Sequence, residues 1–104
     1  MSVLPVIAEP NRQKILQLIW TEEKPAGAIA GHFAVTFGAV SQHLRVLREH
    51  GLVDLRKQGR THFYKANRQA LGPLAEYLES LWWGHLQKLK TLAEDAELNR
   101  KPRN

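Results

Sequence analysis

The sequence predicts an α+β fold that is mainly α-helical and contains one small β-hairpin. Apolar residues recur at three- and four-residue spacing in several segments, as they do on one face of a helix. Around the glycine at position 59, two runs mix apolar and polar residues in the manner of paired strands. The chain has 104 residues, enough for one modest core and too few for two. We therefore expect one domain at residues 1–98, followed by a basic, disordered tail at residues 99–104.

The first third of the chain predicts three short helices. The apolar residues 2–8 form the first, which ends before Pro10 because the residue that precedes a proline avoids helical torsion angles. Pro10 suits the first turn of a second helix, which extends to about Trp20. Residues 21–27 are polar, contain a proline and a glycine, and predict a loop. A third helix follows, and its inward-facing residues are Ile29, Ala30 and Phe33.

The fourth helix has clear signals at both ends. Thr36 is expected to cap its first turn, because a threonine oxygen accepts hydrogen bonds from the free backbone N–H groups there. Gly51 and then Leu52 follow the last turn, a pattern typical of a left-handed glycine cap, so the helix ends at about His50. The inward stripe of this helix is Val40, Leu44 and Leu47. Its opposite face consists of Gly38, Ser41, Gln42, Arg45 and Arg48.

Two strands are expected after the fourth helix. Val53 and Leu55 alternate with polar residues, and Phe63 and Tyr64 lie among polar residues in the segment 61–66. The residues between these runs, 57–60, read KQGR. The pattern therefore predicts a β-hairpin whose tip is charged.

The positive charge of the chain is concentrated in one segment. The net charge is +5, and residues 42–68 carry seven Lys or Arg side chains against two acidic ones, Glu49 and Asp54. The remainder of the chain is balanced. A basic excess confined to one segment favours a polyanionic partner, although a solvated charged surface is the simpler alternative.

The last segment, residues 68–97, predicts one long helix. Its apolar stripe is Leu71, Ala75, Leu78, Trp82, His85, Leu89, Leu92 and Ala96. A chain of this size has little left to cover such a stripe, so it is expected to pair with another helix across an interface. An apolar ligand held near Trp82 and Trp83, between paired helices, is an alternative use of the same residues.

Two short helices, a tight turn, a helix with a small polar outer face and a basic hairpin predict a helix-turn-helix followed by a wing. In such a fold the second helix of the motif enters the major groove of double-stranded DNA, where short side chains allow close approach. Ser41 and Gln42 can then form hydrogen bonds with base edges. Lys57 and Arg60, on either side of Gly59, are suited to phosphate groups.

At these residues the sequence resembles the ArsR family of bacterial winged-helix repressors. The matching stretches are EPNRQKILQLI, VSQHLRVLREHGLV and RKQGRTHFYKAN, and with the flanking helices they cover almost all of residues 2–96. The resemblance implies a homodimer, paired through its first and last helices, that binds a palindromic operator and represses transcription.

The resemblance also implies contact residues. For DNA these are Phe37, Gly38, Ser41 and Gln42, with Arg45, Lys57 and Arg60 in support. To the same site we assign Thr36, and also His43, which we expect to touch a phosphate. Phe37 and Gly38 replace the polar residue and the helix starter that are common in the family, so base preference does not transfer at these two positions. For the dimer interface we expect Leu4, Ile7, Leu71, Leu78, Trp82, His85 and Leu89.

Several classes of function are not expected. The chain has no cysteine, so the cysteine pair by which many members of this family sense metals is missing, and His85 has Lys88 rather than a ligand three residues on. We expect no metal site, no cofactor and no enzymatic activity, and the sequence does not identify a small-molecule inducer. No apolar run approaches the ~20 residues of a membrane span, and the start of the chain does not read as a signal peptide, so a cytoplasmic protein is expected.

Two other functions remain open from the sequence. His32, His43 and His62 could act as acid-base groups in a nucleic-acid-processing enzyme. Alternatively, the winged helix could bind a partner protein in place of DNA.

Overall fold

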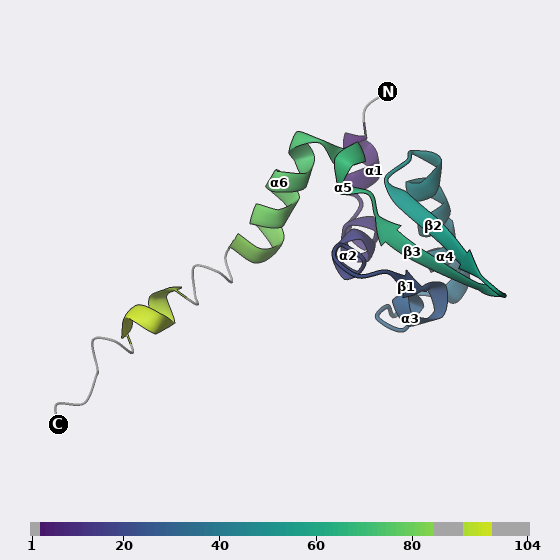
Figure 1. Cartoon of the computed structure of the whole chain (residues 1–104), viewed down its shortest axis with the longest axis horizontal. Coiled ribbons are helices and arrows are strands. Elements are labelled where there is room, and N and C mark those ends of the chain that lie inside the picture. Colours follow the sequence, from purple (N-terminus) through teal and green to yellow (C-terminus); the bar gives the residue numbers. More distant parts are fainter. Residues whose placement is uncertain (1–2, 85–90, 97–104) are drawn as a thin grey trace. The chain divides into compact units, whose positions relative to one another are not determined.

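The computed structural model describes residues 3–84 and 91–96 (Figure 1). The residues up to Leu71 form one compact unit, and those from Gly72 form a second. The first unit contains, in order, α1 (Leu4–Ala8), α2 (Pro10–Leu18), β1 (Lys24–Pro25), α3 (Ala26–Ala30), α4 (Phe37–Glu49), β2 (Val53–Gln58), β3 (Thr61–Ala66) and α5 (Arg68–Leu71). The second contains α6 (Pro73–Glu79) and the π-helical segment η1 (Ser80–Gly84). Residues 91–96 are also helical.

The first two helices meet at Glu9. Its backbone is extended, which ends α1, and its carboxylate accepts hydrogen bonds from the N–H groups of Asn11 at 2.8 Å and Arg12 at 3.3 Å. These two N–H groups have no partner inside the helix, so Glu9 caps α2. The expected helix start at Pro10 is confirmed, whereas α2 ends at Leu18, two residues before the expected Trp20.

Helix α4 has the two ends that the sequence predicts. The hydroxyl oxygen of Thr36 accepts a hydrogen bond from the N–H of Ala39 at 3.1 Å. At the other end Gly51 has a φ of 73°, in the left-handed region. The Leu52 N–H donates to the carbonyl of Leu47 at 3.0 Å, and the Gly51 N–H donates to that of Arg48 at 2.9 Å. This pair of hydrogen bonds is a Schellman motif, which closes the helix and turns the chain toward β2.

The sheet has three antiparallel strands in the order β1-β3-β2. Strands β2 and β3 form the predicted hairpin, with Gln58 opposite Thr61, so that only Gly59 and Arg60 make the turn. The prediction of a loop at residues 21–27 is wrong in part, because Lys24 pairs with Tyr64 and Pro25 with Phe63. Proline is tolerated there because β1 is an edge strand, where a missing N–H need not break the ladder.

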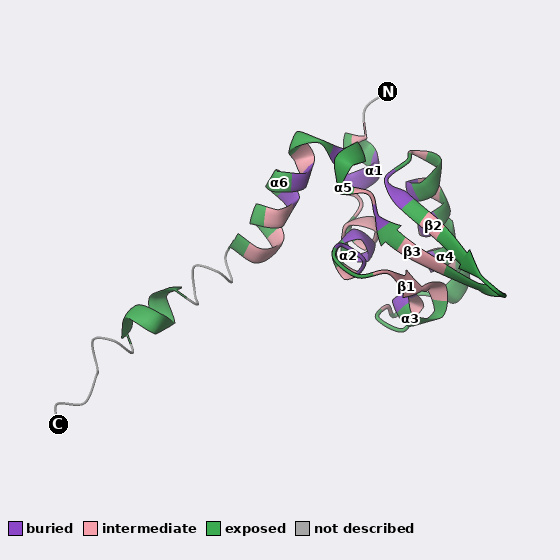
Figure 2. Ribbon diagram, in the orientation of Figure 1, coloured by how far each residue is buried: buried purple, intermediate pink, exposed green. Residues whose placement is uncertain are grey.

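The core of the first unit lies between the helices and one face of the sheet (Figure 2). Its largest fully buried side chains are Trp20, Ile15, Leu16, Ile19, Ile29, Leu44, Leu47, Leu52 and Val40. The predicted inward stripe of α4 is therefore confirmed. Two backbone hydrogen bonds attach the end of the hairpin to this core, from Ala66 N–H to the carbonyl of Ile19 at 2.9 Å and from Asn67 N–H to that of Leu52 at 2.8 Å.

The prediction of one continuous helix over residues 68–97 is wrong. Helix α5 ends at Leu71, and Gly72 has a φ of 57°, which a helix cannot contain and a side chain would disfavour. Pro73 then begins α6, because a proline fits the first turn of a helix and not its interior. The apolar periodicity continues across this break, which is why the stripe alone suggested one helix. The positions expected to continue it at His85 and Leu89, and the expected tail at residues 99–104, lie outside the described residues.

Candidate nucleic-acid interface

One side of α4 is free of internal packing. Phe37, Gly38, Ser41, Gln42 and Arg45 are all exposed, whereas the opposite stripe is buried in the core. Thr36 is exposed too, and its hydroxyl is used to cap the helix. The helix thus presents one aromatic side chain, Phe37, and otherwise small or polar groups near its N-terminus, on a backbone fixed at both ends.

A hollow of about 430 Å³ lies between the first turn of α4 and the hairpin. It is lined by Pro25, Ala26, Gly27, Phe37, Ser41, Arg60, Thr61, His62 and Tyr64. The structure therefore brings together the two segments that the sequence assigned to DNA, the outer face of α4 and the hairpin tip. Thr61, His62 and Tyr64 were not among the predicted contacts. The two-residue alternation of a strand already places His62 and Tyr64 on the same face.

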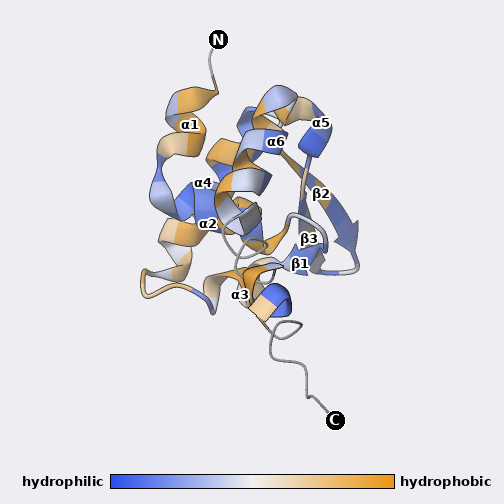
Figure 3. Cartoon of the chain, turned by 90° about the vertical axis from the view of Figure 1, so that its left-hand side faces the viewer, coloured by the Kyte–Doolittle hydropathy of each residue, from blue (hydrophilic) through white to orange (hydrophobic). Residues whose placement is uncertain are grey.

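The cations of the hairpin differ in their surroundings. Arg56 donates through Nε to both carboxylate oxygens of Glu23, each at 3.1 Å, and through Nη2 to Oε1 of Glu23. Its guanidinium lies 4.5 Å from the centre of the Phe63 ring. The hydrogen bond and the charge of Arg56 lower the pKa of Glu23. Lys57 and Arg60 form no ion pair within the described part of the chain and are exposed. Figure 3 shows the strongly hydrophilic outer half of β2. The charge of Arg56 is thus neutralised internally, while those of Lys57 and Arg60 remain available to a partner.

Among the described residues Arg45, unlike Lys57 and Arg60, forms an ion pair, and this ion pair is exposed. Its Nε lies 3.2 Å from Oε2 of Glu49, one turn further along α4, and both side chains are well exposed. An exposed pair of this kind contributes little to stability. Arg45 can therefore exchange its partner for a phosphate at small cost.

The ring of His43 contacts residues of its own chain at the junction of α1 and α2. Its Nδ1 lies 3.3 Å from Oε2 of Glu9 and 3.3 Å from Nη1 of Arg12, whose Nε donates to the carbonyl of Val6 at 2.7 Å. The His43 side chain is only 20% exposed. Nδ1 is therefore directed toward the α1–α2 junction, and the expected phosphate contact of His43 stays a prediction.

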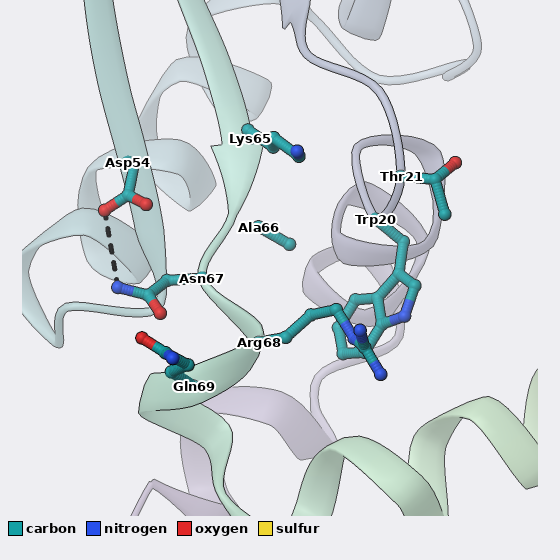
Figure 4. A pocket seen from close by; sticks show the side chains of 8 residues that line it. All are labelled: Trp20, Thr21, Asp54, Lys65, Ala66, Asn67, Arg68 and Gln69. Carbon is teal, nitrogen blue, oxygen red and sulfur yellow. Dashed lines mark hydrogen bonds between the residues drawn. The ribbon is translucent and has the colours of Figure 1, made fainter.

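A second hollow, of about 380 Å³, lies where the hairpin joins α5 (Figure 4). Asn67 donates through Nδ2 to Asp54 at 3.4 Å and accepts the N–H of Ala70 at 3.0 Å, which caps α5. The guanidinium of Arg68 lies 5.7 Å from the centre of the Trp20 ring. These contacts fasten the base of the hairpin to α5 and explain the polar lining of the hollow.

The residues expected at a dimer interface fall into three groups. Ile7, Leu71 and Leu78 are already buried within one chain, which corrects the premise that the whole stripe lacks internal cover. Leu4 is 55% exposed, and Trp82 is half-buried with its ring perpendicular to that of Trp83, at 5.3 Å between centres. His85 and Leu89 lie outside the described residues. Leu92 and Ala96 are the stripe residues that are exposed within residues 71–84 and 91–96, and Leu81, which is not a member of that stripe, is also more than half exposed.

The described residues contain no group of three or more His, Cys, Asp or Glu side chains arranged to hold a metal ion. None of the helices described is long and apolar enough to span a membrane. His32, His43 and His62 belong to three different elements, the turn after α3, α4 itself and β3.

Comparison with known proteins gives a consistent result. Residues 9–54 match a family model described as "Bacterial regulatory protein, arsR family". The chain is 31% identical over 70 residues to the transcriptional repressor SdpR of Bacillus subtilis (strain 168), covering 67% of this chain and 78% of that protein. It is also 31% identical over 80 residues to the transcriptional activator HlyU of Vibrio cholerae, covering 77% of this chain and 74% of that protein.

The fold has similar solved structures. A crystal structure of a possible transcriptional regulator for arsenical resistance superposes with a TM-score of 0.67 at 40% identity, covering 88% of this chain and 95% of that one. A structure of HlyU from Vibrio cholerae gives a TM-score of 0.69 at 31% identity, covering 77% of this chain and 87% of that one. The predicted winged helix-turn-helix is thereby confirmed.

Proposed function

The chain belongs to the ArsR family of bacterial regulatory proteins and is a DNA-binding transcriptional regulator rather than an enzyme, and from this premise we propose that it is a homodimeric repressor of a palindromic operator. Proteins similar to it are named both as repressors and as an activator. Repression is the simpler mechanism, because a dimer bound over a promoter blocks access without any further contact. A regulator that acts on bacterial DNA is expected in the cytoplasm.

The arrangement of α4 and the hairpin around one hollow supports this function. We assign base recognition to Gln42 and Ser41, because their side chains are exposed near the N-terminus of α4, where a helix in the major groove reaches base edges. We assign phosphate contacts to Lys57 and Arg60, because their charges are not neutralised by the described residues. Thr36 and Gly38 complete the first turn of the reading helix, and Arg45 lies one turn beyond Ser41.

The two-fold symmetry of a palindromic operator supports a homodimer. A single helix of this length contacts only a few base pairs, and two copies related by a two-fold axis read a palindrome with much higher specificity. We place the interface on the first and last helices, with Leu4 and Trp82 as the exposed and half-exposed residues of the predicted set.

Regulation through thiolate-bound metal is not part of the proposal. The chain has no cysteine, so the soft sulfur ligands that arsenite and cadmium prefer are missing from it. If this protein responds to an inducer, we expect a ligand of another chemical class.

The assignment is tested by binding titrations. An operator is first selected from a random duplex pool with the wild-type protein. Gln42→Ala should then lower affinity for the operator by about 1–3 kcal/mol and change affinity for scrambled DNA much less, as the loss of a base-edge hydrogen bond does. Arg60→Ala should weaken both duplexes similarly, and the log-log salt slope should fall by about one unit for each phosphate that the protein no longer neutralises.

Three outcomes would count against the proposal. Equal loss on both duplexes for Gln42→Ala, with operator-specific loss for Arg60→Ala, would reverse the roles of helix and hairpin. A wild-type protein with no DNA affinity even at low salt would favour a protein-interaction module. Cleavage of the labelled duplex, abolished by substitution of His32 or His62, would favour a nucleic-acid-processing enzyme.

A further inference from the structure

Phe37 is a large aromatic residue that the fold leaves exposed. It is the first residue of α4, directly after the capping Thr36, and its side chain is 56% exposed. The stripe of α4 that faces the core consists of the buried Val40, Leu44 and Leu47. Phe37 is therefore outside the packing that holds the helix in place, and the fold does not account for its size or its apolar character.

The surroundings of Phe37 leave its ring open to a large partner. It lines the hollow between α4 and the hairpin together with Ser41, His62 and Tyr64. The next residue, Gly38, adds no side chain, and a Cβ built there would find only the Thr36 hydroxyl oxygen, at 3.9 Å. The first turn of α4 thus presents one bulky apolar group beside a bare backbone, on the surface that we propose to face the major groove.

The major groove offers few apolar groups. Base edges there consist of hydrogen-bond donors and acceptors, with one exception, the C5-methyl group of thymine. A phenyl ring cannot donate or accept a conventional hydrogen bond, so a base contact through Phe37 gains free energy mainly by removing apolar surface from water. The methyl group is the chemical feature of standard DNA that meets this requirement.

We propose that Phe37 recognises the C5-methyl group of a thymine in each half of the operator. This inference rests on the proposed function and makes it more specific. Ser41 and Gln42 would select bases by hydrogen bonding, while Phe37 would distinguish thymine from cytosine by an apolar contact with the methyl group. Burying one methyl group corresponds to a factor of about four in affinity.

Deoxyuridine provides a direct test, because it has the same base-pairing edge as thymidine and lacks only the methyl group. Each thymine of the selected operator is replaced singly by deoxyuridine, and the dissociation constant is measured for the wild type, Phe37→Ala and the control Val35→Ala. Val35 is a suitable control because it is also apolar and exposed, two residues earlier, and precedes the cap of α4.

We expect one thymine in each half-site at which deoxyuridine weakens wild-type binding by about fourfold. Phe37→Ala should bind the natural operator more weakly and should be insensitive to deoxyuridine at that thymine. Val35→Ala should keep the full wild-type sensitivity. Phe37→Leu, which retains an apolar side chain, should keep part of it.

The inference is overturned if Phe37→Ala shows the same deoxyuridine sensitivity as the wild type at every position, or if the wild type is insensitive throughout. Both results leave sequence-specific DNA binding intact, so they are distinguishable from failure of the proposed function, in which the wild type selects no operator. Thermal unfolding verifies that each variant is folded. If Phe37→Ala does not fold, Phe37→Gln and Phe37→Leu support the same comparison, since a polar side chain should remove the sensitivity that an apolar one keeps.

Discussion

At the scale of single residues, Gly38 is a helical glycine that the fold does not require. Its φ is not positive, and an added Cβ would contact only the Thr36 hydroxyl oxygen, at an ordinary van der Waals distance. A glycine inside a helix lowers stability by about 0.5–1 kcal/mol relative to alanine. The proposed close approach of DNA to the first turn of α4 would explain this cost, because a side chain here would separate the backbone from the base edges.

Gly38→Ala should therefore stabilise the fold and weaken DNA binding. We expect the free energy of unfolding to rise by up to about 1 kcal/mol and the affinity for the operator to fall. Denaturant unfolding and binding titrations measure the two quantities. Gly31→Ala is the matched control, because Gly31 also has helical torsion angles and its added Cβ would lie at an ordinary 3.5 Å from the carbonyl oxygen of Ala28. Unchanged operator affinity in Gly38→Ala would contradict the close approach.

A second residue-scale prediction concerns His43 and Glu9. The two side chains lie 3.3 Å apart, and both are mostly covered, so their interaction should be measurable. In a double-mutant cycle with Glu9→Gln and His43→Ala we expect a coupling free energy of about 0.5–1.5 kcal/mol in denaturant unfolding. His43 would then act by positioning α4, and its substitution should weaken binding to operator and random DNA together. Strictly additive effects on unfolding would show that this contact does not stabilise the fold.

At the scale of elements, the ion pair between Glu23 and Arg56 joins the segment before β1 to strand β2. The hydrogen bond from Arg56 is the largest cause that lowers the pKa of Glu23 below its ordinary value of 4.5. Because the folded state favours the ionised carboxylate, this ion pair stabilises the folded state at pH values above the ordinary pKa of Glu23. The stabilisation is lost as the pH falls through the lowered pKa.

Glu23→Gln should therefore lower the melting temperature at neutral pH, and its difference from the wild type should shrink on acidification below about pH 4.5. Thermal unfolding over a series of pH values measures this. Glu22→Gln serves as the control, because the Glu22 side chain is 77% exposed and pairs with Lys24 two residues away, within the same segment. A constant difference at every pH would indicate that Glu23 acts through packing and not through charge.

Some of the elements can be predicted from local sequence signals, and others cannot. The ends of α4 and the hairpin were predictable because Thr36, Gly51 and the alternation after residue 53 act through neighbours in the sequence. Strand β1 was not, since two residues become a strand only by pairing with β3, about 40 positions later. The break at Gly72 has a local signal, a glycine followed by a proline, but the apolar periodicity that continues across it favours a single helix.

The candidate site also contains residues that local sequence signals predict and residues that they do not. Helical periodicity alone identified the outer face of α4, from Gly38 to Arg45, as exposed. The contact of His43 with Glu9 joins α4 to the residue between α1 and α2, and no local pattern signals it. The contribution of His62 and Tyr64 to the hollow depends on how the hairpin lies beside α4, which packing determines.

At the scale of the whole molecule, we expect two copies of the chain to associate. Leu4, Tyr77, Leu81 and Leu92 are exposed apolar or aromatic side chains of the helices at the two ends of the chain. We expect a dimer at micromolar concentration, and Trp82→Ala should weaken it by about 2–4 kcal/mol, the cost of truncating a large interface side chain. Sedimentation measures the equilibrium, and Lys57→Ala, on the hairpin, should leave it unchanged. A wild-type monomer at this concentration would exclude the dimer.

The short joint between α4 and β2 has a consequence for how such regulators diversify. Three residues separate Glu49 from Val53, and the hydrogen bonds at Leu52 lock them to both the helix and the end of the hairpin. These hydrogen bonds hold the helix and the hairpin in one relative position, which would set the spacing between the bases and the phosphates that we propose they contact. On the proposed assignment, related regulators would acquire new target sequences by exchanging side chains at positions 37–42, whereas an insertion at positions 50–52 would misalign the helix and the hairpin together.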